Sequence, residues 1–205
     1  MNKEQVQSIL LKKLKFSADD IIKLSVFHDE LLKFNKKYNL ISKSTESCIW
    51  DRHILDSAQI TRFINFENNK SLSDMGSGAG FPGIVLAIFN KNHKFHVKLY
   101  EKSNIKCDFL ENIKNKLNLN CDILGRYQDD KICSEYVVSR AFKKLVEILR
   151  ISRETVEVNH KLIVLKGKNA ENEINKLQQP LKFMYKLEKS ITEINSRILI
   201  VDVKK

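Results

Sequence analysis

Four of the six glycines in this chain lie within eight residues, between Gly76 and Gly83. Glycine has no Cβ, so such a segment turns tightly at positive φ and brings main-chain N–H groups against a ligand. The segment lies between a short apolar run at 71–75 and the apolar residues 84–89, which is the strand, turn and helix order of cofactor sites in α/β proteins. Asp74 adds a carboxylate two residues before the first glycine. The sequence therefore predicts a cofactor site at this turn.

Two nucleotide cofactors are compatible with the glycine turn. The run from Gly78 to Gly83 satisfies the dinucleotide pattern G-x-G-x-x-G, which is weakly specific by itself. The Asp74 carboxylate would repel a pyrophosphate, whereas it would attract the ammonium and sulfonium groups of S-adenosylmethionine. We therefore expect S-adenosylmethionine, bound by Asp74 and by the backbone of Gly76, Gly78 and Gly80.

A second acid is expected at the end of the next strand, where it can accept hydrogen bonds from ribose hydroxyls. Glu101 follows the apolar run 97–100 and lies 27 residues after Asp74, which leaves room for one helix and one strand. The alternative is a solvated glutamate at a strand end. The glycine turn upstream favours the ribose role.

The elements that position these residues follow from apolar patterning. Short apolar runs alternate with helical segments from residue 71 onward, which predicts an α/β fold with a mostly parallel, doubly wound sheet. The expected strands are 71–75, 95–100, 121–124, 136–139, 161–166, 181–187 and 197–203. The expected helices are 82–90, 104–117, a short one at 128–132, 142–156 and 170–178. No helix separates the last two strands, so an antiparallel hairpin should close one edge of the sheet.

The first 65 residues contain neither glycine nor proline and are expected to be helical. Apolar spacing predicts one helix ending near Leu14, a second from the N-cap Ser17 to Tyr38, and a third from Ser47 to about Phe63. We expect residues 1–65 to be a helical cap that forms one compact unit with a core of residues 66–205.

Composition narrows the class of protein. Lys and Arg exceed Asp and Glu by 36 to 25, and a net charge of +11 attracts polyanions such as nucleic acid. Cys48, Cys107, Cys121 and Cys133 are widely spaced and form no metal-binding pattern, so we expect reduced thiols and no metal. No apolar run is long enough to cross a bilayer. We expect a monomeric cytoplasmic protein that does not contact a membrane.

Several segments together carry a resemblance to a known family. They are Asn35–Ser42 (NKKYNLIS), Arg52–Ser57 (RHILDS), Asp74–Gly83, Val138–Phe142 (VSRAF) and Leu165–Gly167. Along its whole length the chain resembles the RsmG/GidB family of bacterial small-subunit ribosomal RNA methyltransferases, which methylate one guanine at N7. The resemblance implies a Rossmann-like class I S-adenosylmethionine-dependent methyltransferase fold with an N-terminal helical cap, acting on 16S rRNA of the small ribosomal subunit.

The resemblance also implies which residues contact the cofactor. They are Gly76, Phe81, Tyr127, Gln128 and Arg140, with adenine near Tyr127 and Gln128. The chain departs from the family at three positions. Gln128 stands where Glu is common, Glu101 is one methylene longer than the usual Asp, and Ile105 replaces a basic residue.

Methylation at guanine N7 uses an existing lone pair, so it requires no general base. Consistent with this, the chain has no Asn/Asp-Pro-Pro-aromatic tetrad and no Pro-Cys pair. Arg140 is the first candidate for orienting guanine, since a guanidinium matches the O6/N7 edge. A direct bond to N7 would block the lone pair, so we expect Arg140 to contact O6, a phosphate or the cofactor. The alternative is a structural arginine paired with a carboxylate at the end of the sheet.

Polar residues outside the glycine turn are candidates for RNA contact. They are Asn39, Ser42, Arg52, His53 and Lys166. For Arg52 and His53 an equally favoured alternative is a core histidine beside a surface ion pair between Arg52 and Asp56 at i, i+4 spacing. Two other functions also stay open at this point: an NAD-dependent oxidoreductase, and an RNA-binding protein that holds the cofactor without turnover.

Overall fold

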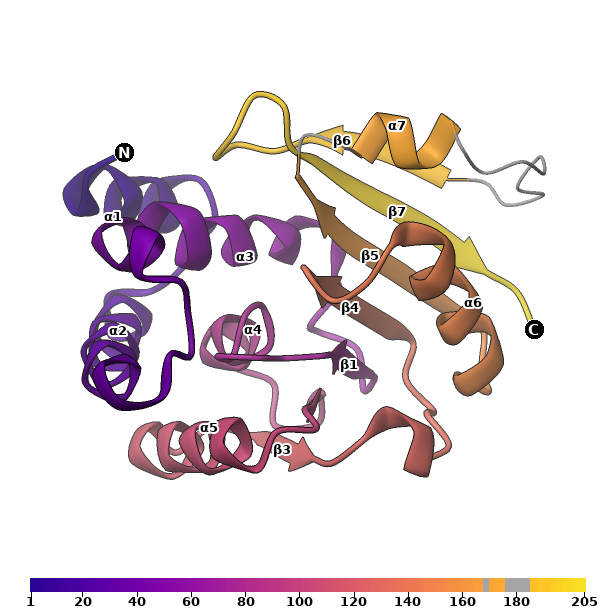
Figure 1. Cartoon of the computed structure of the whole chain (residues 1–205), viewed down its shortest axis with the longest axis horizontal. Helices are drawn as coiled ribbons and strands as arrows, with labels where there is room; N and C mark the ends of the chain where they lie inside the picture. Colours follow the sequence, from indigo (N-terminus) through magenta and orange to yellow (C-terminus); the bar gives the residue numbers. More distant parts are fainter. Residues whose placement is uncertain (168–169, 176–184) are drawn as a thin grey trace.

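The computed structural model describes residues 1–167, 170–175 and 185–205. In this part of the chain seven strands form one sheet between two layers of helices (Figure 1). The strands are β1 Ser71–Met75, β2 His96–Tyr100, β3 Cys121–Leu124, β4 Tyr136–Arg140, β5 His160–Lys166, β6 Tyr185–Lys189 and β7 Arg197–Val203. Their order is β3-β2-β1-β4-β5-β7-β6, with β1 to β5 parallel and β7 antiparallel to both β5 and β6. The predicted doubly wound sheet with an antiparallel edge hairpin is confirmed.

The strand order reverses between β1 and β4, which are paired in parallel at the centre of the sheet. A crevice forms at such a switch point outside the carboxyl ends of the strands. The glycine turn follows β1 directly, so it lies at this crevice.

Side chains that alternate along the strands form two buried cores, one on each face of the sheet. Val138 and Ile163 belong to the core under the cap, whereas Val137 and Leu162 belong to the core on the other face. The period of two residues explains why neighbours along one strand serve opposite layers.

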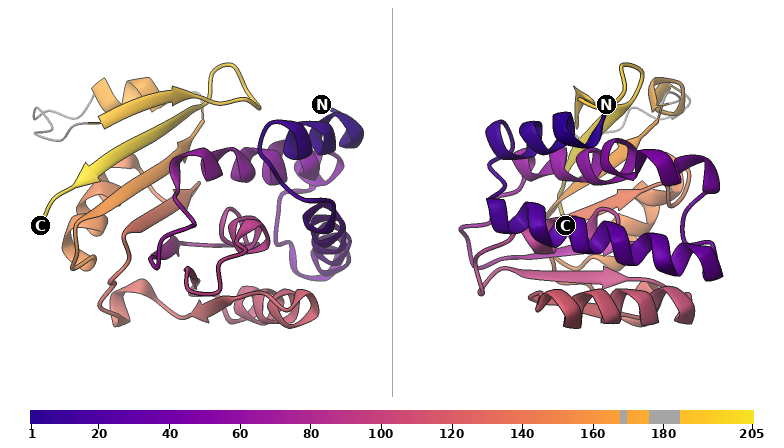
Figure 2. Two further views of the ribbon diagram at one scale, coloured as in Figure 1. Left: turned by 180° about the vertical axis from the view of Figure 1, so that it is seen from behind. Right: turned by 90° about the vertical axis from the view of Figure 1, so that its left-hand side faces the viewer.

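The helices divide between these two faces. Their bounds are α1 Lys3–Lys12, α2 Ala18–Tyr38, α4 Gly83–Phe89, α5 Asn104–Leu117, α6 Leu145–Thr155 and α7 Ala170–Asn175. α1, α2, α4 and α5 contribute to the first core, and α6 to the second. Figure 2 shows α1, α2 and α5 as one side of the molecule, with α6, α7 and the C-terminus at the opposite end. None of the described helices is both long and apolar enough to span a lipid bilayer.

Local sequence explains where the long helices begin and end. Ser17 and Asp20 form a reciprocal capping box at the start of α2. Asn39 and Asn118 take the left-handed conformation that ends α2 and α5. The bounds predicted for α5 and for the C-terminal end of α2 are therefore confirmed.

The predicted third helix is a longer segment with changing helical winding. It comprises a 3-10 segment Lys43–Cys48, a π segment Trp50–Leu55, the short α3 Asp56–Ala58 and a 3-10 segment Gln59–Phe63. We call it the 43–63 rod. The predicted end of this helix near Phe63 is confirmed, whereas the predicted start at Ser47 is wrong, because the 3-10 segment begins at Lys43. The backbone carbonyl of Arg52 accepts a hydrogen bond from Arg140, and Gln59 binds Ser190.

Other differences are small. α6 begins at Leu145 and not at Phe142, because Ala141 adopts a positive φ of 49° and turns the chain first. The helix expected at 128–132 is a single 3-10 turn, Tyr127–Asp129. Residues 176–178 of the helix expected at 170–178 and residues 181–184 of the strand expected at 181–187 lie outside the described residues.

The cap and the sheet share one core. Phe27 of α2 packs against Phe81 in the glycine turn and against Phe109 of α5, with ring centroids 5.1 and 6.2 Å apart. The division of the chain at residue 65 stays a prediction.

Candidate functional site

The glycine turn adopts the backbone geometry that its composition predicts. Gly76, Gly78 and Gly80 have φ values of +75°, +59° and +93°. At Gly78 an added Cβ would meet no atom closer than 3.9 Å, so the backbone there is open to a ligand. At Gly83 a Cβ would come within 2.7 Å of the Asp74 carboxylate and of Leu99, so only glycine permits this close approach.

Asp74 lies beneath the turn and is fully buried. Its Oδ2 accepts a hydrogen bond from the Gly83 N–H at 2.9 Å, whereas its buried Oδ1 has no partner among the described residues. Burial raises the pKa of Asp74 to about 7. The side chain does not line the adjoining cavity, and its hydrogen bond to the Gly83 N–H supports the turn from beneath. Asp74 is buried beneath the turn and not in the cavity wall, so this geometry does not support the predicted direct contact between Asp74 and the cofactor.

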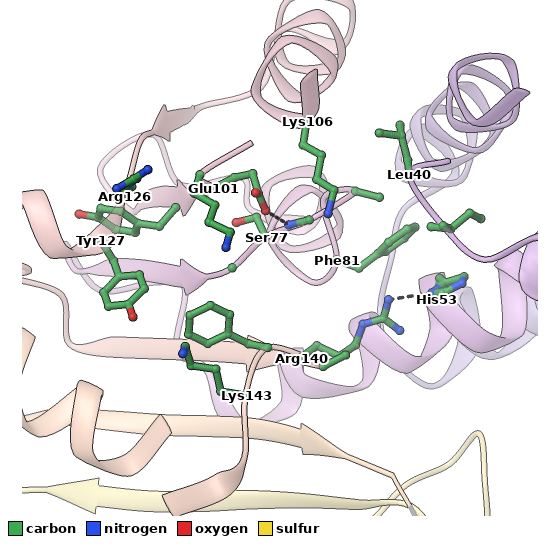
Figure 3. Close-up of a pocket in the computed structure, with 18 of the residues that line it drawn as sticks. Leu40, His53, Ser77, Phe81, Glu101, Lys106, Arg126, Tyr127, Arg140 and Lys143 are labelled. Carbon is green, nitrogen blue, oxygen red and sulfur yellow. Dashed lines mark hydrogen bonds between the residues drawn. The ribbon is translucent and has the colours of Figure 1, made fainter. Parts of the chain in front are cut away.

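A cavity of about 770 Å³ opens at the carboxyl ends of β1, β2, β3 and β4 (Figure 3). Nine of the predicted site residues line it: Gly76, Gly78, Phe81, Glu101, Tyr127, Gln128, Arg140, Ser42 and His53. Asp74, Gly80 and Asn39 do not. Gly80 packs against Ile84 and Leu110, and Asn39 is the exposed residue that ends α2. We call this space the first cavity.

Glu101 is bound to the glycine turn. Its Oε2 accepts from the Gly78 N–H and its Oε1 from the Ser103 N–H, both at 2.9 Å. The side chain is buried, so the alternative of a solvated strand-end glutamate is wrong. Each carboxylate oxygen retains a lone pair that can accept from a ligand hydroxyl.

Arg140, the last residue of β4, donates hydrogen bonds to three residues. Its Nη1 donates to the Arg52 carbonyl at 3.0 Å and to Asp56 Oδ2 at 3.4 Å, and its Nη2 donates to His53 Nδ1 at 2.7 Å. The guanidinium also lies 5.2 Å from the Phe81 ring centroid. Burial lowers the pKa of Arg140, and the Asp56 carboxylate opposes this shift. The carboxylate that pairs with Arg140 therefore comes from the 43–63 rod and not from the end of the sheet.

His53 is a neutral imidazole that forms hydrogen bonds both to Arg140 and to the cap. Burial, with the charges of Arg140 and Arg52, lowers the pKa of His53 to about 3, so the imidazole is neutral near pH 7. Because Arg140 can only donate, Nδ1 carries the lone pair and Nε2 carries the proton. Nε2 donates to Thr45 Oγ1 at 2.9 Å, and Thr45 donates to the Ser42 carbonyl at 2.9 Å. The ring stacks on Phe81 with centroids 5.0 Å apart (Figure 3).

Arg52 and Asp56 do not pair with each other. Arg52 forms an ion pair with Glu193, in the loop between β6 and β7. Asp56 instead binds Arg140 and accepts from Thr192 Oγ1 at 3.0 Å, and burial raises its pKa against the opposing charge of Arg140. The i, i+4 ion pair of the alternative interpretation is wrong, since both side chains find partners on distant elements.

Arg52 and Lys166 line a second cavity of about 590 Å³. Lys166, at the end of β5, pairs with Glu173 of α7 at 2.8 Å. The predicted site residues thus divide between two cavities.

The structure adds residues that the sequence analysis missed in the first cavity. They include Thr45, Lys102, Lys106, Arg126 and Phe142. Several follow the carboxyl end of a strand, which is the same signal that singled out Glu101. Phe142 lies against Gly76 and forms an edge-to-face pair with Tyr127, with centroids 5.6 Å apart. Among the described residues, no group of three His, Cys, Asp or Glu side chains could hold a metal ion.

Solved structures resemble this fold at low sequence identity. An O-methyltransferase from Bacillus cereus in complex with SAH has a TM-score of 0.60 at 12% identity, covering 98% of this chain and 97% of that one. A mutant of MtNAS in complex with S-adenosylmethionine has a TM-score of 0.62 at 11% identity, covering 100% of this chain and 85% of that one. At this identity the likeness concerns the fold, which is that of class I methyltransferases.

Sequence comparisons identify the family. The family model GidB, described as rRNA small subunit methyltransferase G, matches residues 20–200. Ribosomal RNA small subunit methyltransferase G of Pelagibacter ubique is 36% identical, over 93% of this chain and 92% of the relative. The proteins of the same name from Rickettsia akari and Orientia tsutsugamushi are 38% and 34% identical, over 92% and 98% of this chain and 96% and 99% of those relatives. The chain therefore belongs to the GidB family.

Proposed function

We propose that this protein transfers a methyl group from S-adenosylmethionine to N7 of a guanine in 16S rRNA of the small ribosomal subunit. The observation that carries the proposal is the first cavity. It gathers the glycine turn, Glu101, Tyr127, Gln128 and Arg140 at the switch point of a sheet in a chain of the GidB family. The names of the relatives specify small-subunit ribosomal RNA as their substrate.

The residues around the first cavity fit the cofactor. Its volume lies within the range of about 300–1,000 Å³ typical of small-ligand sites. Glu101 has lone pairs free for ribose hydroxyls, and Tyr127 and Gln128 lie where adenine can pack. The unpartnered Oδ1 of Asp74 lies under the turn. A cationic ligand nearby would stabilise the ionised form of this carboxyl, whereas a diphosphate would oppose it, so the residue favours S-adenosylmethionine. When bound, S-adenosylmethionine supplies an electrophilic methyl group on its sulfonium.

The protein's own part in the reaction is to position the guanine against the methyl donor. Three described partners fix the Arg140 guanidinium, and two of its five N–H groups have no partner named among the described residues. These groups can donate to guanine O6 or to a phosphate and leave the N7 lone pair free. Alignment of this kind contributes up to about 7–11 kcal/mol to a two-substrate reaction.

The proposal extends to partners and location. The net charge of +11 suits a polyanionic partner, here the small subunit or its RNA. We also propose that the protein acts as a monomer in the cytoplasm.

Mass spectrometry of small-subunit RNA nucleosides from cells with and without this protein tests the function. Loss of one 7-methylguanosine per small subunit supports it, and restoration by a plasmid copy excludes a secondary effect. An unchanged content of 7-methylguanosine contradicts it. Calorimetry with S-adenosylmethionine and NAD separates the methyltransferase from an oxidoreductase, because only the first ligand should bind.

A further inference from the structure

The second cavity adjoins the first along a common wall. Thr45, His53, Arg140 and Ala141 line both cavities. The end of β5 and the loop between β6 and β7 form the remaining walls of the second cavity, through residues such as Gly167, Ser190 and Ser196. A molecule in one cavity can therefore meet a molecule in the other beside Arg140.

The loop between β6 and β7 is attached to the 43–63 rod by several polar contacts. Gln59, which is fully buried, donates to Ser190 Oγ at 3.0 Å and accepts from the Ile191 N–H at 2.9 Å. Thr192 donates to Asp56, as described above. Side chains one helical turn apart on the rod thus fix the loop at the mouth of the cavity. These contacts hold the loop against the rod, so the loop forms a defined wall of the second cavity.

Its lining offers hydrogen-bond donors and acceptors together. Arg140, Lys166 and Arg197 supply donors, and their side chains are 16%, 12% and 18% exposed. Asp56 and Glu173 supply carboxylate acceptors. Guanine presents acceptors at O6 and N7 and donors at its N2 amino group, so it matches a lining of both kinds.

The mouth of this cavity carries an exchangeable ion pair. Arg52 and Glu193 are 50% and 40% exposed, and exposed ion pairs contribute only about 0–1 kcal/mol. An RNA phosphate can therefore replace the Glu193 carboxylate as the partner of Arg52 at little cost in free energy.

We infer that the second cavity receives the target guanine nucleotide, splayed out of the RNA, with N7 facing the first cavity beside Arg140. The inference rests on the proposed function and adds the place and form of the substrate. In an RNA helix N7 lies in a deep, narrow major groove that side chains cannot reach. A base in a pocket of this kind must leave the stack, as it does in other enzymes that modify bases.

Two glycines permit a matched test. Gly167 lines the second cavity and Gly125 the first, and at both positions an added Cβ would meet no atom within 4 Å. Gly167→Phe and Gly125→Phe therefore fill one cavity each. Val146→Phe, on an exposed position of α6 outside both cavities, controls for the added ring.

The substrate is small-subunit particles from cells lacking this protein, with tritiated S-adenosylmethionine as donor. Gly167→Phe should bind S-adenosylmethionine within about twofold of wild type yet lose about 100-fold in kcat/KM for the particle. Gly125→Phe should lose S-adenosylmethionine binding, and Val146→Phe should match wild type. Ser196→Trp fills the second cavity from the loop and should repeat the Gly167→Phe result if that variant fails to fold.

The outcomes separate the inference from the proposed function. If both cavity-filling variants, Gly167→Phe and Ser196→Trp, fold and methylate within threefold of wild type, the second cavity does not receive the nucleotide and the inference is wrong. If wild-type protein transfers no methyl group to the particle, the proposed function is wrong, and so is the inference that rests on it.

Discussion

Replacement of Asp74 by Asn should change how the stability of the protein depends on pH. Burial raises the pKa of Asp74 from 3.8 to about 7, so the folded state binds this proton more tightly than the unfolded state. Wild type should therefore lose stability as pH rises from about 4 to 7, and each pKa unit corresponds to 1.36 kcal/mol. Between pH 5 and pH 8 the loss from this carboxylate alone is about 3 kcal/mol. Asp74→Asn has no such loss, because the amide does not titrate.

Urea unfolding of wild type and Asp74→Asn at both pH values measures this difference. The Asn carbonyl can still accept from the Gly83 N–H, and any fixed cost of the buried NH₂ group cancels between the two pH values. Asp74→Asn should gain about 3 kcal/mol relative to wild type on going from pH 5 to pH 8. Asp19→Asn, at a side chain that is 63% exposed, makes the same Asp-to-Asn change at the surface and serves as the control. An equal pH dependence of wild type and Asp74→Asn would refute the reasoning.

Other perturbations follow from the same contacts. Arg140→Ala should abolish methyl transfer and destabilise the fold by about 3 kcal/mol, because it leaves Asp56 buried without its cation. The double variant Arg140→Ala/Asp56→Asn should regain stability in thermal melting but should stay inactive. Recovered activity would show that Arg140 is not part of the site. His53→Ala should lower kcat/KM about tenfold, since one hydrogen bond to a charged group contributes about 1.5–3 kcal/mol. His53→Gln, which can accept from Arg140 and donate to Thr45, should recover part of that loss, and equal rates for the two variants would leave His53 a packing role only. RNA affinity should fall steeply with salt: the logarithm of the binding constant against the logarithm of the salt concentration should have a slope of about −2 to −4 for three to six phosphate contacts. Filter binding measures this slope, and a flat response would argue against a polyanionic substrate.

Local patterns were sufficient to predict most of the sheet and the glycine turn. The strands at 71–75, 121–124 and 197–203 and the helix at 104–117 have the predicted bounds, because apolar period and capping are encoded within each segment. Gly76, Gly78 and Gly80 adopt the positive φ that their spacing predicts. Glu101 was found because strand ends in a parallel sheet meet at one edge.

The partners of the site residues could not be predicted from local sequence. Arg52 binds Glu193, which lies 141 residues away, and Arg140 binds the Arg52 carbonyl, 88 residues away. Both faces of β1 are buried, so the spacing of Asp74 to the glycines does not show whether its side chain reaches the cavity or stays beneath the turn. The π winding at Trp50–Leu55 in the 43–63 rod likewise has no signal in the local apolar pattern.

Transfer by purified protein tests the proposed activity most directly. Wild-type protein, tritiated S-adenosylmethionine and small-subunit particles from cells lacking the protein are incubated, and the RNA is digested to nucleosides. We predict that the label elutes as 7-methylguanosine, at no more than one methyl group per particle. Label in another nucleoside, or none in the RNA while S-adenosylmethionine binds, would contradict the proposed reaction.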